Sequence, residues 1–244
     1  MLEAIELTKI YPDGLTALDA VSFRVTSGDL FCLAGANGAG KTTAISCFLD
    51  FISPSSGRVE VDGIHVARNP IEAKRRVAYV SENVALYGAL TARQNLRFFA
   101  HLGENRDRVS RRELEETMHA VRLPVAVLDR RVEAFSKGMR QKVGLAIALL
   151  RGANNLILDE PTSGLDPQSG AEFMDLLACL RDAGAAILMS THDLFRAKSH
   201  ADRLGLMRQG RLCGTLSRDE IASSDTEELY AAAALEPAGR AGQR

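Results

Sequence analysis

The sequence has almost no net charge, and this absence bears first on nucleic acids. Thirty lysines and arginines stand against 31 aspartates and glutamates, which gives a formal net charge of −1 over 244 residues. Such a balance provides no electrostatic case for nucleic acid as the principal ligand, although it leaves room for a local basic patch. We therefore expect no nucleic-acid partner.

Long apolar runs are also absent. A helix that crosses a bilayer takes about 20 consecutive apolar residues, and the apolar runs at 144–150 and 185–189 are far shorter. The first six residues, MLEAIE, are acidic and alternating, which is unlike a signal peptide. We therefore expect any role at a membrane to depend on a partner.

The cysteines form no C-x-x-C pair. There are four, scattered along the chain, and three of them (Cys32, Cys47 and Cys179) lie inside apolar runs. Buried free cysteine behaves as a small hydrophobic residue, and reduced thiols are typical of a reducing compartment. We predict that these three cysteines belong to the core.

The order of strand-like and helix-like segments predicts an α/β fold. Hydrophobic residues make up 46% of a chain that is long enough for one large domain or for a core with an inserted subdomain. Strands are predicted at 2–7, 21–25, 58–61, 77–80, 156–158 and 186–190, a helix at 168–183, and a hairpin at 204–216. Strand–helix alternation favours a parallel sheet. The all-helical stretch at about 83–150 indicates an inserted subdomain, and we expect the tail after Leu235 to be disordered.

Capping patterns mark where the inserted helices begin. Thr91 with Gln94, and Ser110 with Glu113, both fit the capping box, and Gly103 is predicted to end the first helix. The predicted apolar stripes are Leu96, Phe99 and Leu102 on the first helix, and Leu114, Met118 and Val121 on the second.

The most informative motif is GANGAGKT at residues 35–42, which matches the pattern G-x-x-x-x-G-K-[ST]. It follows an apolar run at 30–34 and precedes a helix-like run at 42–51. Glycines let backbone N–H groups approach phosphate oxygens, and the helix that follows adds its positive end. We predict that a nucleotide phosphate group binds here, with Lys41 on the β- and γ-phosphates and Thr42 on Mg²⁺. The phosphate-binding residues are Asn37, Gly38, Ala39, Gly40, Lys41, Thr42 and Thr43.

Two adjacent carboxylates, Asp159 and Glu160, follow the apolar strand at 156–158. Open α/β sheets bind ligands at this end of a strand. One carboxylate can anchor Mg²⁺, and the other can orient or deprotonate an attacking water. A solvated acidic strand end is the alternative for the pair alone, but the phosphate loop makes a site for nucleotide hydrolysis the favoured interpretation.

Further motifs resemble those of ABC-type ATPases. Residues 159–167 resemble the Walker B motif and D-loop, residues 135–142 the signature motif, and residues 190–193 the switch-histidine segment. Residues 79–82 stand where the family has its Q-loop, and Tyr11 stands where it has an adenine-stacking aromatic residue. The motifs occur in the family's order from Met1 to about residue 216.

The resemblance implies an α/β P-loop NTPase core with a mostly parallel sheet, an N-terminal antiparallel β part and an inserted helical subdomain. The nucleotide-binding domain would span residues 1–235, with the helical subdomain at about 83–150 and a disordered tail at 236–244. Domains of this family work in pairs, with two ATP molecules between them. The implied cofactors are therefore ATP and Mg²⁺.

The resemblance also implies a role for each motif residue. Tyr11 would stack on adenine, although a buried core tyrosine remains the alternative; Thr42 and Asp159 would hold Mg²⁺. Glu160 would be the catalytic base, and His192 would contact the γ-phosphate. Ser136, Gly138 and Asp166 belong to the pairing with a second copy: the first two would complete the partner's ATP site, and Asp166 would couple the two sites.

Two departures from the family pattern point to one branch of it. Glu82 replaces the usual glutamine of the Q-loop, and Lys137 and Met139 replace the commonest signature residues; both resemble ABC-2-type exporter ATPases. The resemblance implies that the chain is the ATP-hydrolysing subunit of a bacterial exporter and lies on the cytoplasmic face of the cell membrane. Its partners would be separate transmembrane permease subunits and a second ATP-binding subunit.

Residues 82–90 are the expected docking segment for the permease, through the apolar residues Leu86, Tyr87 and Leu90; internal packing of this loop is the alternative. Two other functions stay open. One is an ABC ATPase that powers a membrane complex for cofactor assembly or another non-transport task. The other is a soluble ABC ATPase that acts on nucleic acid or ribosomes.

Overall fold

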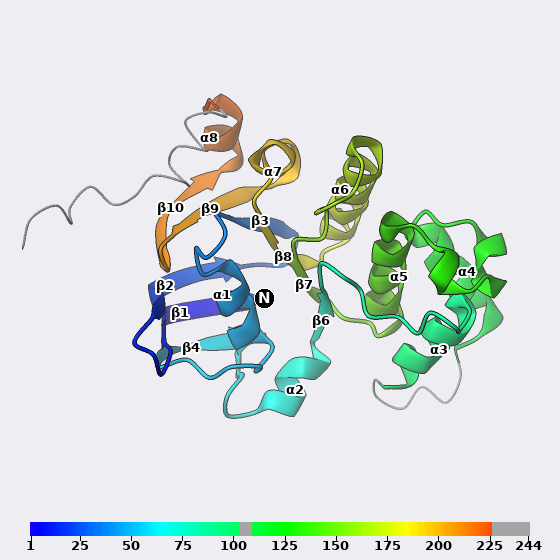
Figure 1. Cartoon of the computed structure of the whole chain (residues 1–244), viewed down its shortest axis with the longest axis horizontal. Helices are drawn as coiled ribbons and strands as arrows, with labels where there is room; N and C mark the ends of the chain where they lie inside the picture. The colour runs from blue at the N-terminus through cyan, green and yellow to red at the C-terminus, as the bar shows by residue number, and fades with distance from the viewer. Residues whose placement is uncertain (103–108, 226–244) are drawn as a thin grey trace, which may run out of the picture.

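The strands form two sheets in the computed structural model, which describes residues 1–102 and 109–225 (Figure 1). The first sheet is antiparallel, in the order β2-β1-β4-β5. Its strands are β1 (Leu2–Ile10), β2 (Thr16–Val25), β4 (Ser56–Val61) and β5 (Ile64–His65). The six-stranded second sheet has the order β10-β9-β3-β8-β7-β6 and is parallel except for the β9–β10 hairpin. Its strands are β3 (Asp29–Ala34), β6 (Val77–Val80), β7 (Asn155–Asp159), β8 (Ala186–Thr191), β9 (Arg203–Arg208) and β10 (Arg211–Ser217).

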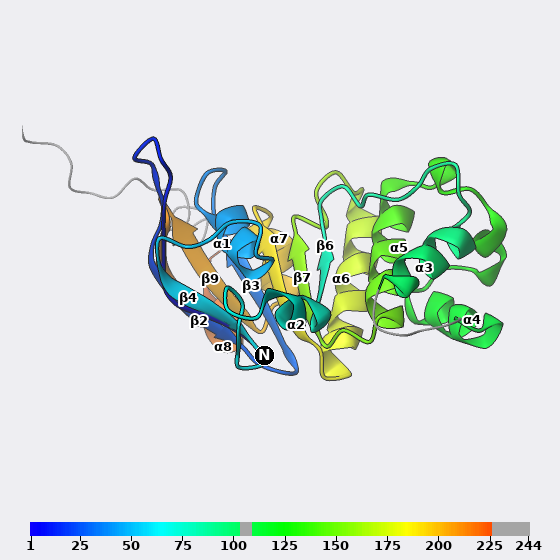
Figure 2. The ribbon, with the colours of Figure 1, turned by 90° about the horizontal axis from the view of Figure 1, so that it is seen from below.

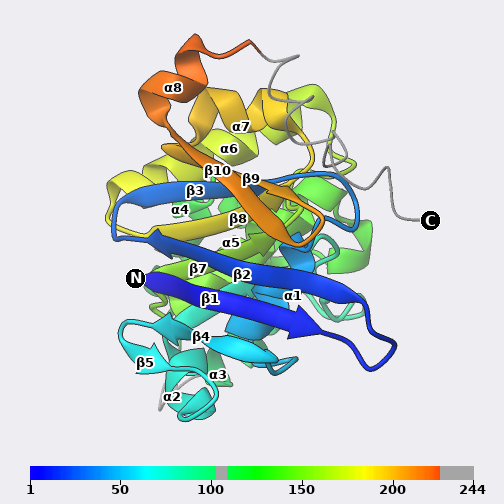
Figure 3. The same ribbon diagram turned by 90° about the vertical axis from the view of Figure 1, so that its left-hand side faces the viewer.

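Helix α1 (Lys41–Phe48) packs between the two sheets (Figure 3). Its buried face shares one core with both sheets. Within that core the ring of Phe23 stacks on Phe31 at 5.2 Å between centroids and lies 5.9 Å from Phe48. This packing ties the phosphate loop, which precedes α1, to a rigid support.

A second core covers the other face of the six-stranded sheet. It is closed by α6 (Pro167–Asp182) and α7 (Leu194–His200), with α8 (Arg218–Ser223) against the β9–β10 hairpin. Helix α2 (Pro70–Arg75) lies beside β5 and β6.

The helices of residues 83–150 extend beyond the β6 edge of the sheet (Figure 2). They are α3 (Ala92–His101), α4 (Arg111–Ala120) and α5 (Lys137–Leu150), with short 3-10 turns at Val125–Asp129 and Val132–Ala134. That they form a separate subdomain, and that the domain ends at 235, stay predictions. The tail at 236–244 lies outside the described residues.

The predicted fold class is confirmed, and most local predictions hold. The strand predictions are confirmed with bounds a few residues longer, and both capping boxes form as predicted, at Thr91 and at Ser110. Leu114, Met118 and Val121 are buried. Leu102 is exposed, so its assignment to the apolar stripe was wrong: it is the C-cap of α3 and follows the last turn of that helix. Gly103 lies outside the described residues.

The cysteine prediction holds for two residues and fails for the third. Cys32 and Cys47 are buried, and burial raises the pKa of the Cys47 thiol to about 11 and that of Cys32 further. Cys179 is exposed, because the buried face of α6 runs through Phe173, Leu176 and Leu177 and leaves residue 179 on the outer face. Among the described residues, no helix has both the length and the apolar character needed to cross a membrane.

Two phenylalanines near the end of α1 give a matched test of the core between the sheets. Phe48 is 1% exposed, whereas Phe51 is 67% exposed and makes a T-shaped contact with Tyr79. We expect Phe48→Ala to lower the free energy of unfolding by about 3–5 kcal/mol, because it leaves a cavity. We expect Phe51→Ala to change it by less than about 1 kcal/mol. Urea unfolding of both variants checks this, and equal losses would contradict the packing described.

Candidate nucleotide site

The parallel register places the C-terminal ends of three central strands, β3, β7 and β8, side by side. Ala34 of β3 lies opposite Thr191 of β8, and Asp159 of β7 lies opposite Ser190 of β8. The loops that leave these three strands therefore begin side by side. Each of them carries one of the predicted motifs.

The phosphate loop, residues 35–42, depends on glycine at two places. Gly40 has φ +104° and immediately precedes α1, and a Cβ there would lie 2.6 Å from the carbonyl oxygen of Ala17. A Cβ on Gly35 would lie 2.3 Å from the carbonyl oxygen of Met207. Any larger residue at either position would push the loop away from its neighbours. The motif therefore fixes the loop as well as the ligand contacts.

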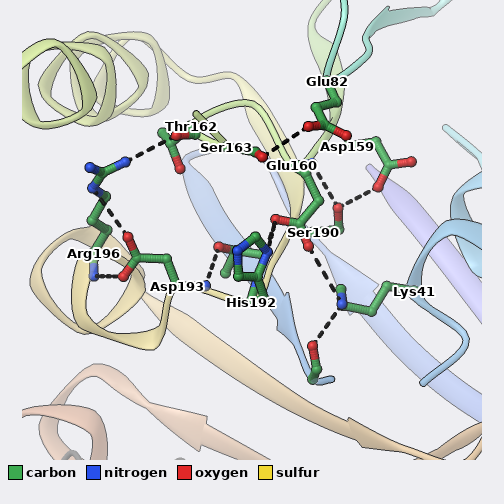
Figure 4. Close-up of polar contacts among 12 residues, drawn as sticks. Lys41, Glu82, Asp159, Glu160, Thr162, Ser163, Ser190, His192, Asp193 and Arg196 are labelled. Atoms are coloured by element: carbon green, nitrogen blue, oxygen red, sulfur yellow. Dashed lines mark hydrogen bonds and ion pairs between the residues drawn. The ribbon is translucent and has the colours of Figure 1, made fainter. Parts of the chain in front are cut away.

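Lys41 is a buried charged residue at these strand ends. Its side chain is only 6% exposed, and its Nζ donates to the carbonyl oxygens of Gly35 at 2.7 Å and Ala36 at 3.2 Å. The same ammonium lies 3.5 Å from Oε1 of Glu160 (Figure 4). A buried cation needs close anionic or carbonyl oxygens to offset its desolvation. Lys41 has both.

The two carboxylates after β7 point to different partners. Asp159 Oδ1 accepts from the hydroxyls of Thr42, at 3.2 Å, and Ser190. The hydroxyl of Ser190 also accepts from the backbone N–H of Glu160 at 2.9 Å. Asp159 thus faces the phosphate loop, and one serine holds both acidic residues in place.

Glu160 sits in a strained backbone conformation between Lys41 and His192. Its φ is +48°, in the left-handed region that residues other than glycine seldom adopt. Its Oε2 lies 2.8 Å from Nδ1 of His192 and accepts from the His192 backbone N–H at 3.3 Å (Figure 4). The imidazole is otherwise 56% exposed. Glu160 is therefore the acceptor that orients His192.

The donor set fits Mg²⁺ and a polyphosphate. The Thr42 hydroxyl and the Asp159 carboxylate are hard oxygen ligands of the type Mg²⁺ prefers, beside a loop whose lysine is buried. Among residues 1–102 and 109–225, no group of three or more His, Cys, Asp or Glu side chains could hold a metal by itself. A cation that takes few protein ligands and completes its shell with water and phosphate suits such a site.

These residues open into a broad cleft of about 1860 Å³. Tyr11 lines it, as do Glu82, Glu160 and the phosphate-binding residues Asn37, Gly38, Ala39, Gly40, Lys41, Thr42 and Thr43. Tyr11 is partly exposed and packs under Lys9 at 5.3 Å, which does not match the alternative of a buried core tyrosine. The cleft exceeds the roughly 300–1,000 Å³ of ordinary ligand pockets. The described residues therefore leave this cleft wider than an ordinary ligand pocket.

The remaining predicted site residues lie outside this cleft. Ser136 is exposed and caps α5 by accepting from the N–H of Met139 at 3.2 Å, and Gly138 lies in the first turn of that helix. Asp166 is exposed and caps α6 by accepting from the N–H of Ser169 at 2.9 Å. Hydrogen bonds from Ser169 hold the pKa of Asp166 below its usual value. Both caps leave helix N-termini at the surface.

Glu82, which replaces the Q-loop glutamine, contacts Lys137, which is itself a departure from the signature motif. Its Oε1 accepts from the hydroxyl of Ser163 at 2.9 Å and lies 3.4 Å from Nζ of Lys137. The Ser163 hydrogen bond and then the Lys137 charge lower the pKa of Glu82. The carboxylate and the ammonium are therefore paired with each other.

Sequence reasoning missed two sets of residues. The β9–β10 hairpin lines the cleft, and Gly210 N–H donates to Ala39 O at 3.0 Å, a contact that no local motif encodes. Arg196 of α7 contacts the segment after Glu160. Ser190 lies within the predicted switch-histidine segment at 190–193, but the sequence did not predict its contact with Asp159.

Comparison with known proteins assigns the family. Residues 18–163 match the family model described as ABC transporter. The chain is 33% identical to the bacitracin transport ATP-binding protein BcrA of Bacillus licheniformis, over 94% of this chain and 74% of that protein. The chain belongs to the ABC transporter ATP-binding family. It therefore belongs to a family of ATPases, and the predicted ATPase activity and exporter-type resemblance are confirmed at that level.

Other members of the family are similar over most of this chain. The probable multidrug ABC transporter ATP-binding protein YbhF of Escherichia coli (strain K12) is 32% identical over 93% of this chain, which spans 39% of YbhF. A solved structure of an ATP-binding subunit of an ABC transporter is 31% identical, with a TM-score of 0.81 over 94% of this chain and 98% of that one. The two-sheet ABC ATPase fold is thus shared.

Ser190 generates a prediction for metal use by this ABC ATPase. Ser190→Ala removes a hydroxyl that holds Asp159, so we expect the Mg²⁺ concentration for half-maximal ATPase activity to rise roughly 10- to 100-fold. Ser223→Ala, which removes an exposed hydroxyl bonded to Glu220, is the matched control. A Mg²⁺ titration of ATPase activity measures both, and an unchanged requirement in Ser190→Ala would contradict this role.

Proposed function

We propose that this chain is the ATP-binding and hydrolysing subunit of a bacterial ABC exporter, that it pairs around two Mg-ATP, and that it drives separate transmembrane subunits. The relatives named for bacitracin and multidrug transport support the exporter class. The observation that carries the proposal is the cluster at one strand edge, where buried Lys41 contacts Glu160 and Glu160 contacts His192.

Charge explains how the phosphate loop acts. The buried ammonium of Lys41 and the N–H groups of the loop attract the β- and γ-phosphates, and Lys41 can exchange its contact with Glu160 for one with phosphate. Thr42 and Asp159 would hold Mg²⁺, and the bound ion would supply positive charge beside the phosphates. Tyr11, which lines the same cleft, stacks on the adenine.

Glu160 acts as the general base in this proposal. Its carboxylate lies at the cleft with a lysine on one side and an imidazole on the other, and the Ser190 hydroxyl fixes its backbone. A carboxylate held in this way can accept a proton from a water aimed at the γ-phosphate. His192, oriented by the same carboxylate, contacts the γ-phosphate and registers its loss.

Pairing with a second copy follows from the residues that lie outside the cleft. Ser136, Gly138 and Asp166 are accessible at the N-termini of α5 and α6 and do not line this chain's own cleft. A capped helix N-terminus attracts phosphate. We infer that the α5 N-terminus completes the partner's cleft, and that Asp166 couples the two sites.

A cluster of aromatic rings beside the Q-loop supports the proposed permease contact. The ring of Tyr87 packs against Phe98 at 5.0 Å and Phe99 at 5.9 Å, and Tyr87 and Phe98 are exposed. Buried Asn95 holds Tyr87 by bonding both its N–H, at 2.8 Å, and its carbonyl, at 3.1 Å. We propose that this cluster, with the half-buried Leu86 and Leu90 beside it, forms an apolar surface for a cytoplasmic segment of the permease. The chain would then lie at the cytoplasmic face of the membrane.

Glu160→Gln tests the proposed base. It keeps the shape of the side chain but removes the proton acceptor, so we expect ATPase activity to fall at least about 100-fold while ATP binding persists. We also expect ATP-bound dimers to accumulate, as measured by size-exclusion chromatography with Mg-ATP. Hydrolysis at the wild-type rate would remove Glu160 from this role.

Mixing two inactive variants tests the shared site. Lys41→Ala disables the phosphate loop, and Ser136→Arg disables the α5 N-terminus. In a mixed pair, one composite site carries both defects and the other carries neither, so we expect measurable ATPase activity to return on mixing. No recovery, although the two variants are shown to associate, would contradict the shared site.

A further inference from the structure

Arg196 joins two loops of the site that leave different strands. It lies on α7, four residues after His192, and its guanidinium reaches the segment 162–165 that follows Glu160 (Figure 4). Nη1 donates to the carbonyl oxygen of Thr162 at 3.1 Å, and Nη2 to that of Leu165 at 3.5 Å. A charged donor on carbonyl oxygens makes a stronger hydrogen bond than a neutral one.

The same arginine is fixed at its other end to the loop that carries His192. Asp193 accepts from the Arg196 backbone N–H at 3.1 Å and pairs with Arg196 Nε at 3.2 Å. The Arg196 side chain is only 19% exposed. The guanidinium therefore forms a short rigid link between the His192 loop and the 162–165 segment.

Gly170 of α6 makes room for this link. A Cβ at Gly170 would lie 2.5 Å from both Cζ and Nη1 of Arg196 and 2.9 Å from Nη2. The absence of a side chain at residue 170 is what allows the guanidinium to lie flat against α6 and reach both carbonyl oxygens.

We propose that Arg196 is a positioning residue for hydrolysis: it holds the 162–165 segment against the His192 loop and thereby sets the contact between Glu160 and His192. The inference rests on the proposed function. The backbone of Glu160 supports this role, because its φ is held at +48°. A strained conformation persists only where neighbouring contacts enforce it. The Ser190 hydroxyl holds Glu160 from the strand side, and Arg196 holds the segment that follows it.

Three variants separate this link from general stability. Arg196→Met removes the donors and keeps a long side chain. Gly170→Ala, on a different helix, displaces the guanidinium without removing it, and alanine is the better residue for a helix. Arg196→Lys retains the charge but presents one donor group in place of a fork. Arg112→Met, which removes an exposed arginine paired with Glu116 on α4, is the matched control.

Steady-state ATPase measurements give the first readout. We expect kcat to fall roughly 10- to 100-fold in Arg196→Met and in Gly170→Ala, with KM for ATP changed by less than about twofold, and an intermediate loss in Arg196→Lys. The double variant should be no slower than Arg196→Met alone, because both changes break one link. Additive losses, or a normal kcat in either single variant, would overturn the proposal.

Hydrogen exchange gives a readout that needs no hydrolysis. The N–H groups of Ser163 and Leu165 are bonded to the carbonyl oxygens of Glu160 and Thr162, and we expect both to exchange faster in Arg196→Met and Gly170→Ala. Amides of β7, β8 and α5 should be unaffected. Unchanged exchange at 162–165 would overturn the link even if wild type proved inactive. A failure of the proposed function would be seen in a different experiment, because the Glu160→Gln variant would then hydrolyse ATP at the wild-type rate.

Discussion

The parallel pairing of β3, β8 and β7 is the constraint on which the rest of the site depends. Because neighbouring parallel strands end at the same edge, the register of Asp159 with Ser190 and of Ala34 with Thr191 brings three loops together. Two packed cores hold that sheet from opposite faces. A shift of one residue between β7 and β8 would separate Glu160 from His192, and a shift between β3 and β8 would move the phosphate loop relative to Ser190 and His192.

The chemistry at that edge comes from charges kept close in a partly buried place. Lys41 is shielded from water, and carbonyl oxygens and Glu160 around it offset the desolvation of its charge. Glu160 in turn orients His192, and Ser190 holds Asp159 toward Thr42. The contacts form one continuous chain of hydrogen bonds and ion pairs across three loops. A change in charge at the phosphate loop therefore reaches His192 through two side chains.

Patterns of neighbouring residues in the sequence predicted many of the strands, the helix starts and the phosphate loop, for physical reasons that differ from one element to the next. Apolar runs gave the strands, and the capping boxes at Thr91 and Ser110 gave helix starts, because both depend on residues close in sequence. The glycines and Lys41 of the phosphate loop are equally local. Contacts between distant segments left no such trace: the pairing of Glu82 with Lys137, the reach of Arg196 to Thr162 and the hairpin contact of Gly210 with Ala39 depend on the tertiary fold. The predictions that Leu102 and Cys179 are buried were wrong for a related reason. Where a helix ends and which of its faces is exposed depend on the elements packed against it.

We propose that the C-terminal ends of β3, β7 and β8, with Lys41 as the buried cation beside them, bind the triphosphate. Titration calorimetry with ATP and Mg²⁺ tests it most directly when wild type is compared with Lys41→Ala. We expect one nucleotide bound per chain in wild type and an affinity at least about 100-fold lower in the variant, a loss of about 2.8 kcal/mol. Equal affinity in the two proteins would contradict it.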